Sequence, residues 1–141
     1  NAHTHPFVAV YEAYKKSGPN VLGVEALQGD DGCTGVKVNT ADGYADYLFS
    51  ATDMQAHHPS KRVSFCGGLG LIREKEGQIQ LMYLGCGRSL KKGNFVLESD
   101  HDVYAAIYMQ HGVWYYSATG PVRVKIGKET KELNEGYNQK L

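Results

Sequence analysis

The stretch VSFCGGLGLIREKEGQIQLMYL, residues 63–84, predicts two apolar strands joined by a polar turn. Side chains alternate between the two faces of a strand, so each arm is expected to present one apolar face. In the first arm this face carries Val63, Phe65, Leu69 and Leu71, and in the second arm Ile79, Leu81 and Tyr83. The stretch therefore predicts a β-hairpin, and with it a chain built from antiparallel strands.

The two apolar faces coincide if Leu71 lies opposite Leu81 and Leu69 lies opposite Tyr83. This register leaves a three-residue loop, at residues 75–77, in which Gly77 occupies the position that needs a left-handed backbone.

The remaining strands are expected on both sides of this hairpin. Further strands are predicted at residues 7–14, 21–28, 35–40, 44–50, 95–98, 103–110, 113–119, 122–126, 130–133 and 137–141. Residues 51–62 and 85–93 are expected to form long loops, and residues 130–141 a final hairpin. No helical stripe of ten or more residues appears, and turn signals recur every eight to twelve residues. The pattern favours an all-β fold, as a barrel or, in our prediction, a two-layer antiparallel β-sandwich.

The length and charge composition of the chain limit the kinds of partner that we expect. Its 141 residues suggest one domain over residues 1–141. Fifteen basic and fifteen acidic residues balance, so we expect no nucleic acid and no membrane surface as a partner. No apolar run approaches the roughly 20 residues of a membrane-spanning helix. The chain begins at Asn1, and we expect it to be a fragment of a larger protein.

The three cysteines do not follow a zinc-site spacing, because no CxxC is present. In the predicted register Cys66 faces Cys86, and two interpretations stay open. A cross-strand disulfide needs Cα atoms about 4.5–5.5 Å apart in that geometry. Two small, buried free thiols are the alternative that we favour.

Histidines and glycines give two weak candidate sites. His3 and His5 are spaced to share one face of a strand, but no acidic or sulfur ligand is close in sequence, so we expect no metal and no cofactor. His57 and His58 are expected to be solvated. The glycines at residues 66–70 lack the Gly-Lys-Ser/Thr and the helix of a phosphate-binding loop, and we interpret them as a bulge or a close backbone approach.

Basic and aromatic side chains give two binding candidates. Arg88, Lys91 and Lys92 are candidate contacts for the acid groups of a polysaccharide, or simply a solvated loop. Pairing Gln110 with Val113 separates the second hairpin into two faces. Residues 103, 105, 107, 109, 114, 116 and 118 form an apolar face directed to the core, and the outward face carries Tyr104, Tyr108 and Tyr115. Tyr108 and Tyr115 are then cross-strand neighbours.

Three interpretations of these tyrosines stay open: a cover folded over them with local hydrogen bonds, an interface with another domain, and stacking against sugar rings.

Several segments resemble the C-terminal β-rich part of heparinase II/III-like polysaccharide lyases. Residues 46–50 (DYLFS) match an Asp-Tyr-hydrophobic-Phe-Ser segment, and residues 70–75 (GLIREK) match a strand that ends in Arg-Glu-Lys. Residues 12–14 (EAY) resemble a Glu-Pro-Tyr segment, with an alanine in place of proline. The resemblance extends over residues 6–127.

The resemblance implies a parent enzyme that cleaves uronate-containing glycans by β-elimination and consists of an α/α toroid followed by β domains. It implies no catalytic residue in this chain, since none of its motifs matches a catalytic position. The expected function is a non-catalytic accessory β-sandwich that packs on the toroid and the preceding β domain, bordering the glycan cleft. An independent carbohydrate-binding module that uses the tyrosine face is the alternative, and a small cupin-type enzyme using the histidines is a third. A periplasmic or secreted bacterial location is implied.

Overall fold

The structure is a computed structural model that describes residues 9, 10, 12, 18–30 and 32–141. Within these ranges it contains eleven strands and no helix. They are β1 (Val21–Leu27), β2 (Cys33–Thr40), β3 (Tyr44–Ala51), β4 (His57–Ser60), β5 (Val63–Lys75), β6 (Gln78–Lys92), β7 (Phe95–Gln110), β8 (Val113–Ala118), β9 (Val122–Ile126), β10 (Glu129–Leu133) and β11 (Gly136–Lys140).

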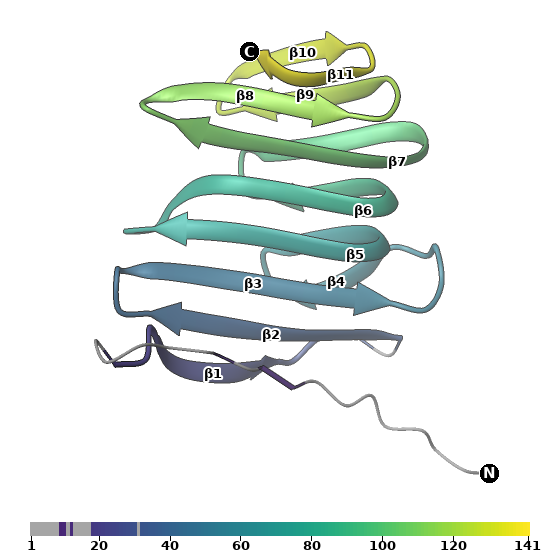
Figure 1. Cartoon of the computed structure of the whole chain (residues 1–141). Coiled ribbons are helices and arrows are strands. Elements are labelled where there is room, and N and C mark those ends of the chain that lie inside the picture. The colour runs from purple at the N-terminus through teal and green to yellow at the C-terminus, as the bar shows by residue number, and fades with distance from the viewer. Residues whose placement is uncertain (1–8, 11, 13–17, 31) are drawn as a thin grey trace, which may run out of the picture.

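All pairings are antiparallel, and the three long central strands serve two layers. The front layer has the order β1-β2-β3-β5-β6-β7-β8-β11. The rear layer reuses the other halves of β5, β6 and β7 and adds β4 on one side and β9 with β10 on the other. Figure 1 shows β4, β9 and β10 lying behind the front strands. The predicted two-layer all-β fold is confirmed, and the described part of the chain offers no helix suited to crossing a bilayer.

Glycines allow the long strands to turn from one layer into the other. The β5–β6 register shifts between Cys66 and Gly67, and there Gly67 pairs with Gly87. A β-carbon on Gly87 would lie 2.8 Å from the α-carbon of Gly67 and 2.7 Å from the Cys66 carbonyl oxygen. Only glycine fits such an approach. The expectation that the glycines at residues 66–70 mark a close backbone approach is confirmed.

The core lies between the layers. The ring of Phe49, from the front layer, contacts that of Phe65, from the rear layer, at a centroid distance of 5.0 Å. Phe95 and Trp114 make a second contact between the layers at 5.7 Å. Around these rings pack fully buried aliphatic side chains of the three long strands, which are Ile72, Met82, Leu84, Leu90, Leu97 and Ile107. Apolar burial between the two layers is thus the main stabilising term.

An ion pair links the two layers at one end of the sandwich. Glu74 belongs to the front half of β5 and Lys92 to the rear half of β6, and their charged atoms are 2.8 Å apart. Both side chains are mostly buried, with 14% and 15% of their surfaces exposed. The Lys92 ammonium also lies 3.7 Å from the centroid of the Tyr47 ring, which adds a cation–π contact. Lys92 therefore faces the interior of the sandwich.

The predicted register of the first hairpin is wrong by one residue next to the turn and by two residues beyond the first irregularity. Leu71 pairs with Tyr83 and Leu69 with Gly85, while Lys75 pairs with Gln78. The loop consequently has two residues, Glu76 and Gly77, with φ angles of 52° and 75°. Two successive left-handed residues are the signature of a type I′ turn, which matches the twist of the flanking strands.

The predicted faces of this hairpin are also wrong beyond the bend. Val63 and Phe65 are buried as expected, but after Gly67 the alternation changes and Ile72 takes the core position. In β6 a second irregularity falls between the pairs Glu74–Ile79 and Arg73–Leu81, so Met82 and Leu84 become the core residues. Strict alternation fails because each irregularity moves the following side chains to the opposite face.

Three predicted connections also differ from the structure. Residues 51–62 contain β4, and residues 85–93 continue β6 instead of forming a basic loop. The last two strands do not pair with each other, because β10 pairs with β9 in the rear layer and β11 pairs with β8 in the front layer. The predicted strand at residues 7–14 lies largely outside the described residues.

Cys66 does not face Cys86. Cys66 pairs with Ser89, and Cys86 lies in the β6 irregularity with a φ of 49°. All three cysteines are free thiols. Cys86 is exposed and Cys66 is only partly buried, so the expectation of two buried thiols is wrong for both residues. The Cys66 thiol donates to the Met54 carbonyl oxygen at 3.0 Å.

Candidate ligand-binding face

The solvent side of the front layer carries the predicted tyrosines. Tyr108 pairs with Tyr115 across β7 and β8, and their rings stack at 5.9 Å with an interplanar angle of 17°. Gln110 pairs with Val113 over a turn at His111 and Gly112, as the sequence predicts. The arrangement of this hairpin, including its core face, is confirmed.

β11 partly covers this stack. The register of β11 against β8 shifts between Gly136 and Gln139, so Asn138 adopts a left-handed φ of 51° and turns towards β7. The Tyr108 hydroxyl donates to the Asn138 side-chain oxygen, and the Asn138 backbone N–H donates to the Ser117 hydroxyl at 3.0 Å. Tyr108 and Tyr115 are both partly buried, and the Tyr108 hydroxyl is taken up by the contact with Asn138.

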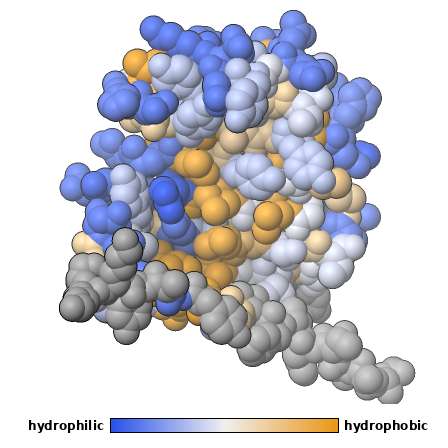
Figure 2. Space-filling model, viewed as in Figure 1, coloured by the Kyte–Doolittle hydropathy of each residue, from blue (hydrophilic) through white to orange (hydrophobic). Residues whose placement is uncertain are grey.

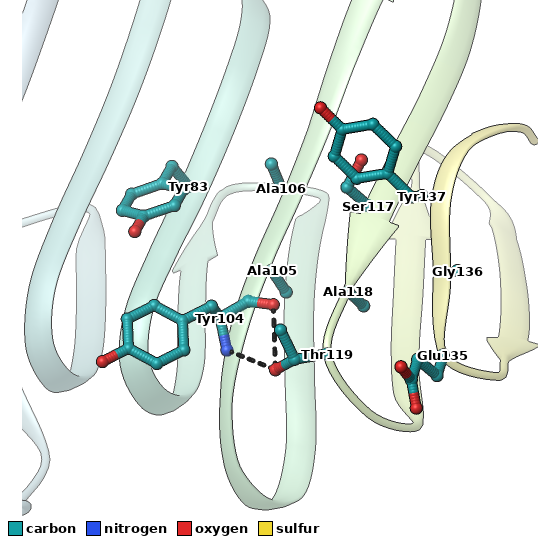
Figure 3. Close-up of a pocket in the computed structure, with 10 residues that line it drawn as sticks. All are labelled: Tyr83, Tyr104, Ala105, Ala106, Ser117, Ala118, Thr119, Glu135, Gly136 and Tyr137. Atoms are coloured by element: carbon teal, nitrogen blue, oxygen red, sulfur yellow. Dashed lines mark hydrogen bonds between the residues drawn. The ribbon is translucent and has the colours of Figure 1, made fainter.

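A groove lies beside this stack, and three other tyrosines, Tyr83, Tyr104 and Tyr137, line it. It measures about 620 Å³ and lies over β6, β7, β8 and the start of β11. Figure 3 shows Tyr83 and Tyr104 on one side of the groove and Tyr137 on the other, with the short side chains of Ala106 and Ser117 between them. Tyr104 is 54% exposed and Tyr137 is 77% exposed. We call this site the tyrosine groove.

The floor of the tyrosine groove follows from strand register. Tyr83 pairs with Ala106, and Ala106 pairs with Ser117, so one large and two small side chains form a row across three strands. A β-carbon on Gly85 would lie 3.1 Å from the Tyr83 ring, so this glycine leaves room for the ring next to the strand. Thr119 also lines the groove, and its hydroxyl accepts from the Tyr104 backbone N–H at 3.0 Å.

The sequence argument missed Tyr83, Glu135 and Tyr137 as residues of this face. It placed Tyr83 on the core side because it assumed unbroken alternation through β6. Glu135 and Tyr137 come from the end of the chain, which pairs with β8 and not with β10. No local signal reveals that pairing, since the partner strand lies some twenty residues earlier.

An apolar patch continues the face on the side of β3 and β5. Leu48 pairs with Leu71, and Leu71 with Tyr83, while Leu81 pairs with Tyr108. Leu69 is 46% exposed, and the other three leucines are partly exposed. Figure 2 shows apolar residues gathered on this face of the molecule. We call Leu48, Leu69, Leu71 and Leu81 the leucine patch.

The three predicted basic contacts do not form a joint site. Arg88 is 2.7 Å from Asp102, Lys91 is 2.8 Å from Glu98, and Lys92 is 2.8 Å from Glu74. Lys92 points between the layers, whereas Arg88 and Lys91 line a mixed-charge depression with Arg123, Glu98, Asp100 and Glu132. Each cation has a carboxylate at contact distance, which offsets part of its charge.

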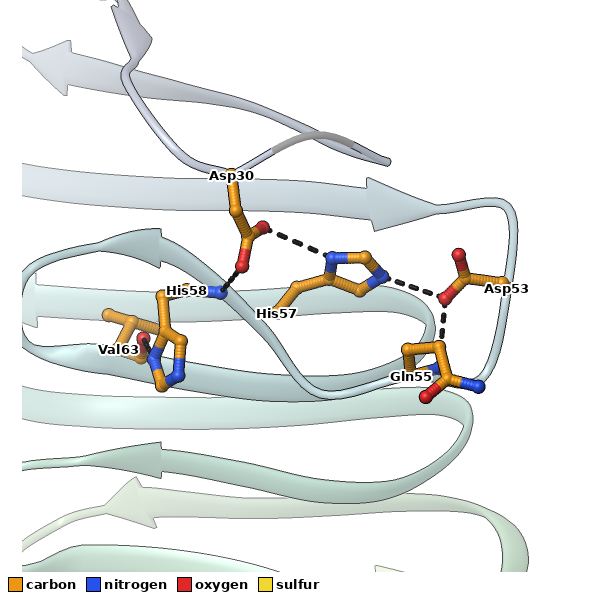
Figure 4. A network of polar contacts seen from close by, with 6 residues as sticks. All are labelled: Asp30, Asp53, Gln55, His57, His58 and Val63. Carbon is orange, nitrogen blue, oxygen red and sulfur yellow. Dashed lines mark hydrogen bonds and ion pairs between the residues drawn. The ribbon is translucent and has the colours of Figure 1, made fainter.

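His57 is buried, contrary to the expectation that it is solvated. It is 4% exposed, and its ring lies between two carboxylates, with Nδ1 3.1 Å from Asp30 and Nε2 2.8 Å from Asp53 (Figure 4). Asp30 also accepts from the His58 backbone N–H and Asp53 from the Gln55 backbone N–H, each at 2.8 Å. The His57 ring thus links Asp30, in the β1–β2 connection, to Asp53, in the loop between β3 and β4.

The charges in this network shift its titration. The hydrogen bond to Asp53 is the main cause that raises the pKa of His57, with a further contribution from Asp30. The backbone hydrogen bonds from His58 and Gln55 are the main causes that lower the pKa values of Asp30 and Asp53. Burial, with help from the two carboxylates, raises the pKa of Cys33 to about 11. The Cys33 thiol therefore stays protonated, and the network is a charged structural clamp.

Among the described residues no three His, Cys, Asp or Glu side chains gather as metal ligands. His3 and His5 lie outside those residues. Among the described residues, the tyrosine groove and the leucine patch are the candidates for binding on the solvent side of the front layer.

Comparison with known proteins points to one family. A family model described as the endo-acting ulvan lyase C-terminal domain matches residues 21–109. An endo-acting ulvan lyase from Formosa agariphila is 34% identical over 101 residues, which cover 67% of this chain and 12% of that protein. No solved structure matches the chain. The chain thus spans 12% of the length of the curated relative that it matches.

Proposed function

The chain belongs to the family of endo-acting ulvan lyase C-terminal domains, and on that premise we propose that it is a non-catalytic accessory domain of a polysaccharide lyase. The observation that carries the proposal is this membership, together with the small share of the relative that the chain covers. The remainder of such a relative has ample length for a catalytic unit. An exported location, periplasmic or secreted, follows from a polymeric substrate and is part of the proposal.

The leucine patch is the surface proposed to contact the rest of the parent protein. Leu48 and Leu71 are direct cross-strand partners, and Leu69 and Leu81 lie near them on the same face of the sheet, so the four leucines form an apolar area of a kind that often marks interaction sites. Interfaces between domains of one chain are of this kind.

The finer assignment to a parent of the heparinase II/III type is also a proposal. It is supported by the two resembling motifs, which are neighbours in space. Asp46 from the first motif pairs with Arg73 from the second, through two hydrogen bonds of 2.7 Å each. Phe49 pairs with Gly70 in the same ladder. The motifs thus describe one structural unit, and the α/α toroid and the preceding β domain are the proposed partners.

The test compares the complete parent protein with a version that lacks this domain. Cleavage of ulvan is followed by the ultraviolet absorbance of the double bond that β-elimination forms. The shortened protein should still cleave ulvan but should melt at a lower temperature, and the 141-residue chain alone should not cleave it. Cleavage by the 141-residue chain would overturn the proposal.

A variant of the full-length parent tests the same contact in case the shortened protein fails to fold. Leu71→Asn combined with Leu81→Asn should lower the melting temperature of the parent by more than that of the isolated 141-residue chain, because these side chains are partly exposed in the isolated chain and would be covered in the parent. Leu22→Asn, at a 70% exposed position on the edge strand β1, is the matched control and should leave both unchanged. Equal effects of the two variants on the parent would contradict docking through the leucine patch.

A further inference from the structure

We propose that a pocket at one end of the sandwich binds a uronate unit of the polysaccharide through Arg62 and the ring of Trp114. The pocket lies at the end where Glu74 and Lys92 pair, and it measures about 390 Å³. We call it the end pocket. The inference rests on the proposed function for the acidic class of the polymer, and it involves neither the tyrosine groove nor the leucine patch.

Two hairpin turns border the end pocket. Residues 76 and 77 connect β5 to β6, and residues 93 and 94 connect β6 to β7. Both turns contribute to the lining, together with Phe95 and Trp114. These two aromatic rings contact each other between the layers at a centroid distance of 5.7 Å. The pocket is therefore a recess with a partly aromatic wall, and its volume falls within the range usual for small-ligand sites.

The end pocket carries an excess of positive charge. Arg62 and Lys92 are the cations that line it, and Glu74 is the one carboxylate among its lining residues. The charges of Lys92 and Glu74 lie 2.8 Å apart and compensate each other. Arg62 is exposed in the turn between β4 and β5, and none of the ion pairs among the described residues involves it. A guanidinium is thus left over, and its planar fork suits a carboxylate.

The remaining lining suits the rest of a sugar unit. Trp114 is partly exposed, and an indole ring offers an apolar face to the C–H groups of a pyranose. Gln78 and Asn94 add amide groups, which both donate and accept hydrogen bonds and so complement hydroxyl groups.

The other two recesses lack one part of this combination. The tyrosine groove has aromatic rings but no Lys or Arg, and the mixed-charge depression has cations but no Phe, Tyr or Trp. The end pocket brings an uncompensated cation and an aromatic ring together, as recognition of an acidic sugar requires.

The experiment uses the intrinsic fluorescence of the 141-residue chain. Trp114 is its single tryptophan, so the emission reports on this pocket. The ligands are oligosaccharides prepared from ulvan, and the same oligosaccharides after their carboxyl groups have been reduced to alcohols. The acidic form should change the emission to saturation, and the reduced form should bind about tenfold more weakly, because it loses a charge-assisted hydrogen bond. Added salt should weaken binding of the acidic form.

Neighbouring cations provide a matched pair of variants. Arg62→Gln should weaken binding of the acidic oligosaccharides by about tenfold, for the same physical reason. Lys61→Gln removes an equal charge from the adjacent position of the same turn, where the side chain is exposed and does not line the pocket. It should change the Kd by less than about twofold. Both variants should melt as the wild type does, since both side chains are exposed.

Native gels cast with ulvan give a second readout that does not depend on the tryptophan. Retardation of the wild-type chain without any change of emission would place binding elsewhere and overturn the inference. So would the absence of binding in both measurements, equal binding of the acidic and reduced oligosaccharides, or equal weakening by Arg62→Gln and Lys61→Gln. None of these outcomes affects the accessory role, which is tested on the parent protein by melting and cleavage.

Discussion

Single glycines decide where large side chains fit. Gly70 lies directly across the ladder from Phe49, and a β-carbon at position 70 would be 2.1 Å from a carbon of that ring. The ring is fully buried against Phe65 and cannot move aside. The absence of a side chain at position 70 therefore sets the position of an aromatic residue in the core.

We predict that Gly70→Ala destabilises the domain by about 1–3 kcal/mol, the usual cost of forcing extra atoms into a packed core. The measurement is the free energy of unfolding in urea. Gly23→Ala is the matched control, because a β-carbon there meets no atom within 4 Å, and its effect should stay within about 0.5 kcal/mol. A Gly70→Ala chain as stable as wild type would mean that the Phe49 ring has another place to go.

The His57 clamp makes a second prediction at this scale. Its raised pKa means that the protonated ring is favoured in the folded state, so its contribution is complete below the ordinary histidine pKa of about 6.5. The contribution is lost as pH rises through the raised pKa. Asp30 and Asp53 have lowered pKa values, so their contribution is lost only in acid.

The stability difference between wild type and His57→Asn should therefore be largest at mildly acidic pH and shrink as the solution becomes alkaline. Urea unfolding at a series of pH values measures it. His111→Asn, at the exposed turn between β7 and β8, is the matched control for the removal of a histidine side chain. A difference for His57→Asn that does not vary with pH would indicate that the ring stays neutral.

At the scale of elements, the success of sequence reasoning depended on unbroken alternation. The β7–β8 hairpin alternates without interruption up to a two-residue turn, so its register and its Tyr108–Tyr115 pair were predictable. In β5 and β6 the bend at Gly67 and the irregularity before Leu81 both change the face of later residues. The glycines near the bend indicated a close approach of two backbones. They did not indicate which side chains after the bend face the core.

Candidate sites show the same limit. The outward position of Tyr104 follows from local alternation, whereas the groove needs Tyr137, which β11 places after the chain has passed through the rear layer. Lys92 is the opposite case. It appeared to belong to a solvated basic loop, yet the continuation of β6 into the rear layer directs it between the layers to Glu74. Pairing between strands that are distant in sequence places both Tyr137 and Lys92. Local strand propensity does not predict such pairing.

The Glu74–Lys92 pair predicts strong coupling between the layers. Glu74→Leu or Lys92→Met alone should each cost about 3 kcal/mol, because a mostly buried charge loses its partner. The double variant Glu74→Leu/Lys92→Met should recover much of the loss, since apolar side chains of similar size suit that environment.

Urea unfolding of the two single variants and the double variant forms the cycle that isolates this coupling. The exposed pair Lys37–Glu25, 3.8 Å apart, is the control and should couple by less than about 1 kcal/mol. Additive effects at Glu74 and Lys92 would show that the pair does not join the layers.

For the whole molecule, the question is which strands make a stable unit. The family model ends at residue 109, within β7, and leaves out β8 to β11. Yet those strands close both layers, since β8 pairs with the front half of β7 and β9 with its rear half. They also supply core residues, which are Tyr116, Ala118, Val122 and Val124.

We therefore predict that a chain ending at residue 109 does not fold cooperatively, although it contains the entire matched segment. Without β8 and β9, the buried side chains of Leu97 and Ile107 would lose cover, and the edge of β7 that faces away from β6 would be open in both layers for pairing with other chains. Thermal melting followed by circular dichroism should show one sharp transition for the 141-residue chain and none for the shortened one. A sharp transition in the shortened chain would place the stable unit within β1 to β7. The last four strands would then be an addition to a core complete without them, and the tyrosine groove, which needs Tyr137, would be an addition as well.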